Sequence, residues 1–244
     1  MHPALKSIAH RPWPLPSSPW TMAQNWHDLL FAHWPIKSEI LRPLVPAELP
    51  LDEYDGQCWV GVVPFRMSGV RLRATPAMPG LSAFPELNVR TYVRVQDRPG
   101  VYFFSLDATN WPAVKAARAF YRLPYFHARM NCREVNGEII YRSRRLRNEA
   151  ELRSRYRPVS SVQFAQPGTL KHWLTERYCL YTVRNQRVYR ADVHHQPWPL
   201  QDAEAQIETN SMAKAAGIEL PTIDPLLYFA RKLEVIVWPL HPVA

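Results

Sequence analysis

The stretch Phe84-Pro85-Glu86-Leu87-Asn88-Val89-Arg90-Thr91-Tyr92-Val93-Arg94 has the alternating pattern of a β-strand. Successive side chains of a strand point to opposite faces, so Glu86, Asn88, Arg90 and Tyr92 share one face and the residues between them share the other. The apolar face is suited to a protein core. The polar face is either a solvated outer face with a cross-strand ion pair, or a row of polar groups inside a barrel that orients a small ligand.

Short runs rich in β-branched and aromatic residues recur along most of the chain and predict further strands. Asn136-Gly137 is a typical two-residue hairpin turn, and Asp97-Arg98-Pro99-Gly100 predicts a second turn. We expect strands at Asp28–Trp34, Cys58–Met67, Glu86–Val95, Val101–Asp107, Tyr125–Glu134, Glu138–Arg144, Tyr178–Val183, Val188–His194 and Leu233–Trp238.

Helical patterns are scarcer, because 24 prolines against 8 glycines interrupt helices over most of the chain. Short helices are expected at Ser38–Val45 and Thr169–Arg177, each capped by its first residue, and at Trp111–Tyr121 and Ser211–Ala216. Many short strands without alternating helices predict an α+β, mostly β fold, an antiparallel barrel or sandwich. The proline-rich residues 1–25 are expected to form an N-terminal arm, followed by a single domain at residues 26–244.

Composition narrows the class of protein. The net charge of +9 comes almost wholly from 24 arginines, which suit anionic ligands or nucleic acid, although such a bias also follows from genome base composition. Apolar runs are too short to cross a bilayer, and five prolines in the first twenty residues do not fit a signal peptide. Three widely spaced cysteines offer neither a disulfide framework nor a zinc site. We therefore expect a cytoplasmic protein that does not enter membranes.

Familiar catalytic motifs are missing from the sequence. It contains no phosphate loop, glycine-rich dinucleotide motif, nucleophile elbow, zinc-protease motif or CxxC pair, so no cofactor is expected. His194 and His195 are adjacent on an expected strand and would point to opposite faces, so no metal site is expected either. Tyr125, His127 and Arg129 share one side of another strand, where a tyrosine and a histidine are either proton-transfer groups or ordinary barrel residues.

A run of arginines lies between Arg142 and Arg157, diluted by two glutamates. It could bind phosphates, with Tyr141 and Tyr156 available to stack on bases. A solvated loop is the more common role of such a basic run.

Several stretches taken together resemble the YqjF-like proteins of bacteria, a family without an established activity. They are Trp26–Trp34, Leu41–Pro46, Trp59–Phe65, Phe84–Val93, Val101–Asp107 and Glu176–Tyr178. The resemblance runs from about Trp26 to the C-terminus. Members of this family are similar in fold to the acetoacetate decarboxylase superfamily, so the resemblance implies a cone-shaped antiparallel β-barrel around a small-molecule pocket.

The resemblance also implies that the decarboxylase nucleophile is missing. That enzyme attacks a keto acid with a lysine that follows a proline, and five residues separate this proline from an arginine before it. Arg118 and Pro124 keep this frame, but Tyr125 and Phe126 stand where two lysines belong. A phenol cannot form a Schiff base, so decarboxylation through an imine is not expected.

Other pocket residues of the superfamily are partly matched. Glu86 corresponds to its pocket glutamate, whereas the positions of its arginine and second acid fall near His27 and Gly61, so those two groups are missing here.

Three hypotheses for the function follow. In the first, Glu86 has a raised pKa and performs acid–base chemistry with Tyr125 on a small oxo or carboxylic acid. Asn88, Arg90, His127 and Arg118 would hold the ligand. In the second, the same pocket binds or senses a small anion without chemistry. The third, nucleic-acid binding through the arginine run, is disfavoured because no binding motif accompanies the charge. A homo-oligomer is left open.

Overall fold

The computed structural model describes residues 2–109 and 123–243, so the helix expected at Trp111–Tyr121 lies outside the described residues. The described chain is mostly β-strand. Its strands are β1 (Met22–Ile36), β2 (Cys58–Leu72), β3 (Phe84–Val95), β4 (Arg98–Ala108), β5 (Tyr125–Val135), β6 (Glu138–Arg145), β7 (Glu151–Pro158), β8 (Cys179–Arg184), β9 (Arg187–His195), β10 (Leu200–Asn210), β11 (Leu226–Val237) and β12 (His241–Pro242). Its helices are α1 (Ser38–Leu41) and α3 (Leu170–Thr175), with 3-10 turns at Pro3–Lys6, Arg42–Leu44 and Lys214–Ala216.

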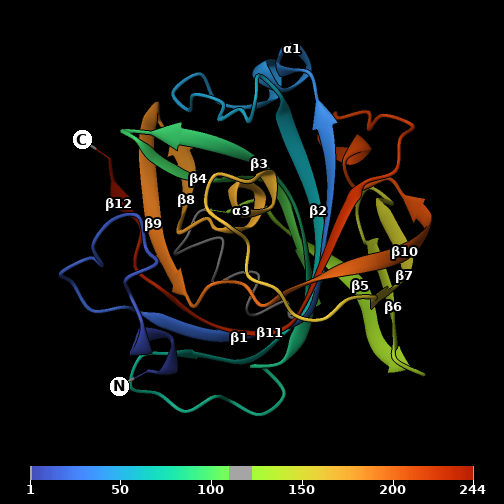
Figure 1. Cartoon of the computed structure of the whole chain (residues 1–244), viewed down its shortest axis with the longest axis horizontal. Coiled ribbons are helices and arrows are strands. Elements are labelled where there is room, and N and C mark those ends of the chain that lie inside the picture. Colours follow the sequence, from blue (N-terminus) through green and yellow to red (C-terminus); the bar gives the residue numbers. More distant parts are fainter. Residues whose placement is uncertain (1, 110–122, 244) are drawn as a thin grey trace.

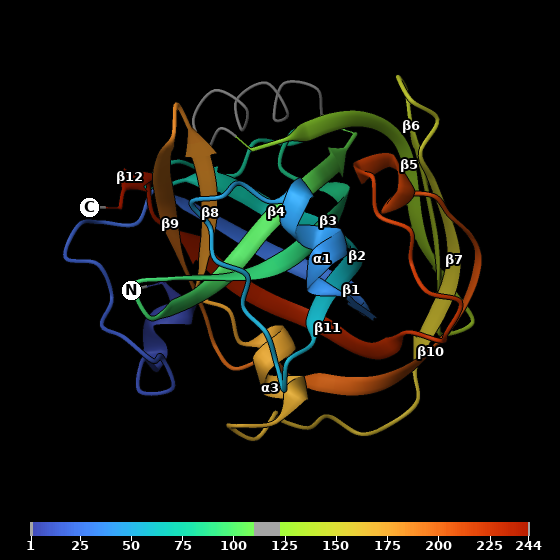
Figure 2. The same cartoon turned by 90° about the horizontal axis from the view of Figure 1, so that it is seen from above.

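One continuous sheet closes on itself twice. Its strand order is β12-β9-β8-β4-β3-β2-β1-β11-β10-β7-β6-β5, with additional pairings of β9 with β11 and of β4 with β5. These pairings close a seven-stranded ring through β8 and β9 and a nine-stranded ring through β5, β6, β7 and β10. Strands β4, β3, β2, β1 and β11 belong to both rings, and we call them the common wall. The two sets of covering strands lie on opposite sides of this wall (Figure 1, Figure 2).

Both faces of the common wall are buried. On β1, Leu29 and Phe31 pack in the seven-stranded ring, and Leu30 and Ala32 pack in the nine-stranded ring. Strands covered on both sides are expected to be apolar almost without interruption. This explains why β1 shows a continuous apolar run rather than an alternating one.

The sheet confirms the mostly β, barrel-type fold expected from the sequence. Every strand pairing within the described residues is antiparallel except β4 with β5 and β4 with β8, which are parallel. A parallel pair needs a crossover connection, whereas hairpins produce antiparallel neighbours. The two parallel seams are therefore where strands distant along the chain meet β4.

All nine expected strands are present, but β7, β10 and the two-residue β12 were missed. In β7, Leu152, Ser154 and Tyr156 are buried while the arginines between them are exposed, so this part of the arginine run is a strand rather than a loop. In β10, exposed acidic residues alternate with half-buried alanines. Alanine and glutamate are poor strand formers, so little in the β10 sequence indicated a strand before its partners were known.

The turns are settled by backbone geometry. Asn136 and Gly137 have φ values of 51° and 79°, which confirms the expected hairpin turn. The turn expected at Asp97–Gly100 is wrong in position. Gln96 and Asp97 form it, with φ values of 50° and 59°, and Val95 pairs directly with Arg98. Two left-handed residues give a turn whose twist matches the strands, so β4 begins earlier than expected.

Three expected helices are shorter in the structure, and the one expected at Ser211–Ala216 is only a 3-10 turn at Lys214–Ala216. Thr169 caps α3 as expected, accepting a hydrogen bond from the His172 amide, but the helix ends at Thr175. The helix expected from Ser38 runs only to Leu41, with Lys37 as its N-cap residue, and continues as a 3-10 turn that contains Pro43. A proline inside a helix removes a backbone hydrogen bond, which accounts for the early end.

The N-terminal segment packs on the barrel. Arg11 forms a buried ion pair of 2.8 Å with Asp192, and the Trp13 indole donates to the same carboxylate. Strand β1 begins at Met22, within the segment expected to be an arm. No helix in residues 2–109 or 123–243 has the length and apolar character needed to span a membrane.

Candidate functional site

The polar row of β3 lies inside the seven-stranded ring. Glu86, Asn88, Arg90 and Tyr92 are only 4%, 5%, 8% and 0% exposed. The row is therefore not a solvated outer face. Tyr92 and Phe84, on the same side of the strand, belong to the core of the seven-stranded ring, whereas Leu87 belongs to that of the nine-stranded ring.

Helix α3 covers this interior. The Tyr92 hydroxyl donates to the Leu174 carbonyl over 2.9 Å, and the Tyr92 and Trp173 rings lie 4.7 Å apart. Figure 1 shows α3 over the space surrounded by β9, β8, β4 and β3. The helix therefore shields this end of the polar row from water.

Glu86 and Tyr125 meet at one end of the row. The Tyr125 hydroxyl donates to Glu86 Oε2 over 2.8 Å, because β5 joins β4 with Tyr125 beside Leu106. Burial raises the pKa of Glu86 to about 8, an effect opposed by the Tyr125 hydrogen bond and reinforced by the charge of Asp107. Glu86 is therefore mostly protonated at neutral pH and can act as a general acid.

Arg90 differs from the other buried arginines. Of the four buried arginines in the described chain, Arg11, Arg145 and Arg177 pair with aspartates at 2.8, 2.9 and 2.6 Å. Arg90 has no ion pair or hydrogen bond with any described residue, and residues 110–122 include no Asp or Glu. Its guanidinium lies over the Phe31 ring at 5.2 Å. A buried cation without a carboxylate is well suited to bind an anionic ligand.

Five buried polar atoms on β1, β2, β3 and the segment before β10 lack partners. They are Arg90 Nε, Asn88 Oδ1, Trp59 Nε1, Trp198 Nε1 and His33 Nδ1. Buried polar atoms are normally hydrogen-bonded, so each of these five can bind a ligand, and unpartnered atoms also occur elsewhere in the described chain, for example Ser143 Oγ and Asn210 Nδ2. The five atoms offer three N–H donors and two acceptors.

His33 is a site residue that the sequence analysis missed. Its Nε2 lies 2.6 Å from the Tyr92 hydroxyl, whose proton goes to Leu174, so Nε2 carries the histidine proton and Nδ1 is an acceptor. Burial and the charge of Arg90 hold the pKa of His33 well below its ordinary value, so the ring is neutral. No local signal marked His33, which lies in an almost continuous apolar run.

Gly61 lies opposite Arg90 on β2. A Cβ atom at this position would lie 3.1 Å from the His33 ring and 3.5 Å from Arg90 Cγ. The His33 ring would have to shift by a few tenths of an ångström to admit this atom, whereas its contact with Arg90 Cγ would be an ordinary one.

No described contact links the two remaining candidate residues to Arg90. His127 Nε2 lies 3.2 Å from the Thr109 carbonyl oxygen, beyond Tyr125 along β5. Arg118 lies outside the described residues. The structure thus brings together Glu86, Tyr125, Asn88 and Arg90.

The arginine run is largely neutralised by carboxylates. Arg144, Arg145, Arg153, Arg155 and Arg157 each pair with an aspartate or glutamate. The two tyrosines considered for base stacking, Tyr141 and Tyr156, are fully buried, so that expectation is wrong. Their hydroxyls bind backbone carbonyl oxygens of the common wall instead.

Metal ligands do not cluster in residues 2–109 and 123–243, where no group of three or more His, Cys, Asp or Glu side chains is placed to hold an ion. His194 Nε2 lies 2.9 Å from the Ala4 carbonyl oxygen, and His195 Nδ1 lies 2.7 Å from that of Gln196. The His194 ring therefore helps to attach the N-terminal segment.

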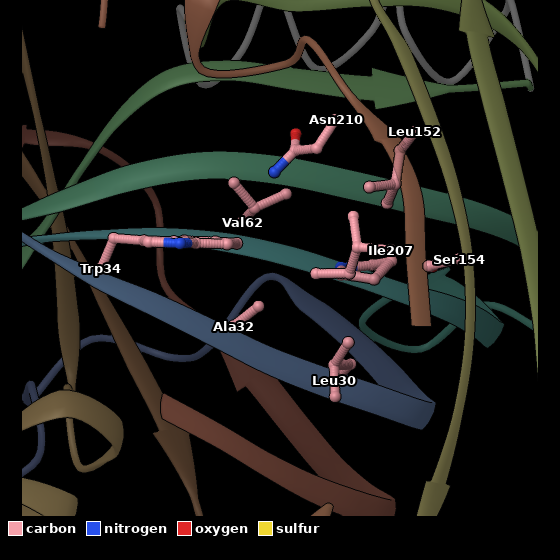
Figure 3. Close-up of a pocket in the computed structure, with 9 residues that line it drawn as sticks. Leu30, Ala32, Trp34, Val62, Leu152, Ser154, Ile207 and Asn210 are labelled. Atoms are coloured by element: carbon pink, nitrogen blue, oxygen red, sulfur yellow. The ribbon is translucent and has the colours of Figure 1, made fainter. Parts of the chain in front are cut away.

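The nine-stranded ring has a small apolar cavity. Figure 3 shows side chains of β1, β2, β7 and β10 pointing toward one another around it. Its volume is about 10 Å³, and most of its lining is aliphatic, with Ser154 and Asn210 as polar members. This is space for about one water molecule, which makes the cavity an unsuitable ligand site.

Comparison with known sequences identifies close relatives. The family model described as DUF2071, uncharacterized conserved protein, matches residues 23–234. The uncharacterized protein YqjF of Bacillus subtilis (strain 168) is 50% identical over 229 residues, covering 93% of this chain and 94% of YqjF.

Solved structures of acetoacetate decarboxylase-like proteins share the fold at low identity. Acetoacetate decarboxylase of Legionella pneumophila has a TM-score of 0.64 at 12% identity, covering 97% of this chain and 93% of that chain. The enduracididine biosynthesis enzyme MppR complexed with pyruvate has a TM-score of 0.63 at 11% identity, covering 96% and 93%. An acetoacetate decarboxylase-like enzyme of Sphingomonas wittichii RW1 has a TM-score of 0.61 at 12% identity, covering 97% and 98%.

Proposed function

The chain belongs to the DUF2071 family of uncharacterized conserved proteins, and from its site we propose that it binds a small oxo or carboxylic acid and acts on it by acid–base catalysis. The observation that carries this proposal is the buried Arg90 guanidinium without a carboxylate partner. A ligand carboxylate would supply the missing negative charge, as aspartates do for the other buried arginines. The ligand is therefore a small anion.

Glu86 would supply the chemistry. In its neutral form it would donate a proton to a carbonyl or leaving hydroxyl oxygen of the bound acid. The resulting carboxylate would keep the hydrogen bond from Tyr125 and would take the proton from the carbon atom next to the reacting one, which returns Glu86 to its neutral form. Enolisation and dehydration both fit this role. Tyr125 follows Pro124 where the decarboxylases have lysine, so no step of this proposal uses an imine.

Asn88 would orient the ligand between these two groups. Its Oδ1 is buried and has no partner, and strand alternation places it between Glu86 and Arg90. An acceptor at this point suits a hydroxyl or an enol. The complex of MppR with pyruvate supports this substrate class, because it shows a small oxo acid bound to a protein of the same fold.

The test is a thermal-shift screen of the full chain against pyruvate, longer oxo acids, hydroxy acids and apolar carboxylates. A ligand at a hundred times its dissociation constant adds about 2.7 kcal/mol of stability. Arg90→Met should abolish the shift, whereas Arg129→Met, which removes an exposed arginine, should retain it. Each compound that binds is then tested for turnover. A shift that survives Arg90→Met would contradict the proposal.

A binding or sensing role without chemistry is the second candidate. It is favoured by Gly61, because this position opposite Arg90 supplies no second acid for proton transfer. Glu86→Gln separates the two candidates. If the protein is an enzyme, turnover is lost while affinity survives; if it only binds, no turnover occurs with any bound acid and affinity depends on Arg90.

We also propose that the protein acts in the cytoplasm. All three cysteines, Cys58, Cys132 and Cys179, are free thiols, as is usual in a reducing compartment. Fractionation of cells that produce the protein at its natural level would test this location.

A further inference from the structure

Strand β4 has a gap in its pairing along one edge. It pairs with β8 at Val101 and Tyr102, and with β5 from Leu106 to Ala108. Between these points neither strand pairs with β4. At the β8 end the seam is tight, because a Cβ atom at Gly100 would lie 2.7 Å from Cys179 Sγ. The two rings therefore separate from each other at residues 103–105.

A cavity lies at this gap. Its volume is about 240 Å³. It is lined by Tyr102 and Phe103 of β4, by Tyr181, Thr182 and Val183 of β8, by Leu123 and Pro124 directly before β5, and by Pro46. We call this cavity the slot. Ligand sites for drug-sized molecules occupy roughly 300–1,000 Å³, so the slot suits a smaller molecule.

Phe103 separates the slot from the polar row. It lines the slot, lies directly opposite Arg90 across β3 and β4, and packs against the core of the seven-stranded ring. The pairing is irregular here: Val89 lies opposite Ser105 and Arg90 opposite Phe103, so Phe104 is the extra residue of a β-bulge. Bulges redirect side chains and are frequent beside active sites. One half-buried aromatic ring thus stands between the slot and a buried, unpaired cation.

We propose that the slot is the passage by which a small acid reaches Arg90, and that the Phe103 ring controls this passage. The proposal rests on the function proposed above for Arg90. It explains how a ligand enters a row that α3 and the common wall otherwise enclose. It also limits the ligand to molecules narrow enough to pass between β8 and β5.

A thiol reporter inside the ring tests the passage without any ligand. Leu106 is buried, faces the same core as Phe103 and lies opposite Asn88. Leu106→Cys would place a thiol there, and mass spectrometry would follow its reaction with methyl methanethiosulfonate. We expect Phe103→Ala to accelerate this labelling at least tenfold and Phe103→Trp to slow it.

The neighbouring residue provides the matched control. Phe104 is also half-buried but is absent from the slot lining and packs with Tyr102, so Phe104→Ala should leave the labelling rate unchanged. Cys58 is buried in the core of the nine-stranded ring and reports general loosening. The passage is refuted if Phe103→Ala does not accelerate labelling, if Phe104→Ala accelerates it equally, or if Cys58 labelling rises in parallel.

Stopped-flow tryptophan fluorescence with pyruvate separates this proposal from the proposed function. If both hold, Phe103→Ala raises the association and dissociation rates by a similar factor, whereas Arg90→Met abolishes binding. Binding that needs Arg90 but has rates unchanged by Phe103→Ala overturns the passage alone. A wild-type protein that binds neither pyruvate nor any other acid of the screen, yet shows the expected labelling pattern, overturns the proposed function and leaves the passage supported.

Discussion

The two faces of the common wall are both buried, but they differ in whether a buried arginine has a carboxylate partner. On the nine-stranded side, Arg145 is held by Asp107 at 2.9 Å. On the seven-stranded side, Arg90 has no carboxylate, and Glu86 is buried with a raised pKa. Burial alone therefore does not distinguish a site from a core. An unpaired charge does distinguish them. The charges of a structural ion pair neutralise each other without a ligand, whereas the charge of Arg90 has no opposite charge beside it.

The largest change in the free energy of unfolding should come from breaking the buried ion pair between Arg145 and Asp107. Asp107→Ala leaves Arg145 buried without a partner, and we expect it to lower the free energy of unfolding by about 3–5 kcal/mol. Urea denaturation measures this loss. Glu204→Ala removes the carboxylate of an exposed pair with Arg157 and should cost at most about 1 kcal/mol. Equal losses in the two variants would contradict the distinction between buried and exposed pairs.

The next effect is a pH dependence that comes from Glu86. Its pKa is about 8 in the folded protein against 4.5 when unperturbed, so between these values the folded state retains a proton that the unfolded state has released. Wild-type stability should therefore fall as pH rises through this window, by up to about 1.4 kcal/mol per pH unit. Glu86→Gln lacks this loss.

Urea denaturation of both proteins from pH 5 to 9 isolates the contribution of Glu86. The difference in free energy of unfolding between Glu86→Gln and the wild type should grow up to about pH 8 and then level off. Asp107, whose pKa is raised to about 6, is present in both proteins and affects the difference little. A difference that stays constant with pH would show that Glu86 is ionised throughout.

A smaller effect is expected from removing the unpaired cation. Arg90→Met leaves no buried carboxylate behind, so the free energy of unfolding should stay the same or rise by about 1 kcal/mol. Arg145→Met is the matched substitution on the other face, and it should be clearly destabilising because it isolates Asp107. If Arg90→Met lowers the free energy of unfolding as much as Arg145→Met, then Arg90 has a structural partner, and this result contradicts the proposed anion site.

The smallest effect concerns the hydrogen bond between Tyr125 and Glu86. This bond lowers the pKa of Glu86, so Tyr125→Phe should raise that pKa further, by up to about one unit. Infrared titration of the protonated carboxyl band, assigned by its loss in Glu86→Gln, measures the shift. An unchanged pKa would mean that the phenol does not donate to Glu86 in solution.

The site was partly predictable from the sequence, because some of its residues lie close together on one strand. Strand alternation placed Glu86, Asn88 and Arg90 on one face, and the structure keeps them there. His33 and Trp198 could not be found this way, because they lie on other segments and no local pattern marks them. Strand β10 was missed for a related reason, since its alanines and glutamates form a strand only beside β7 and β11.

The sequence by itself determined the strands of the common wall, the shared face of the polar row and the tyrosine that follows Pro124. Each depends on backbone periodicity or residue identity. Only the tertiary structure decided that this face is buried and that a slot opens beside Phe103. It also decided that Arg90 lacks the aspartate partner that the other three buried arginines of the described chain have. Burial and pairing depend on residues far apart in the chain, such as Glu86 and Tyr125, which meet only when both rings close.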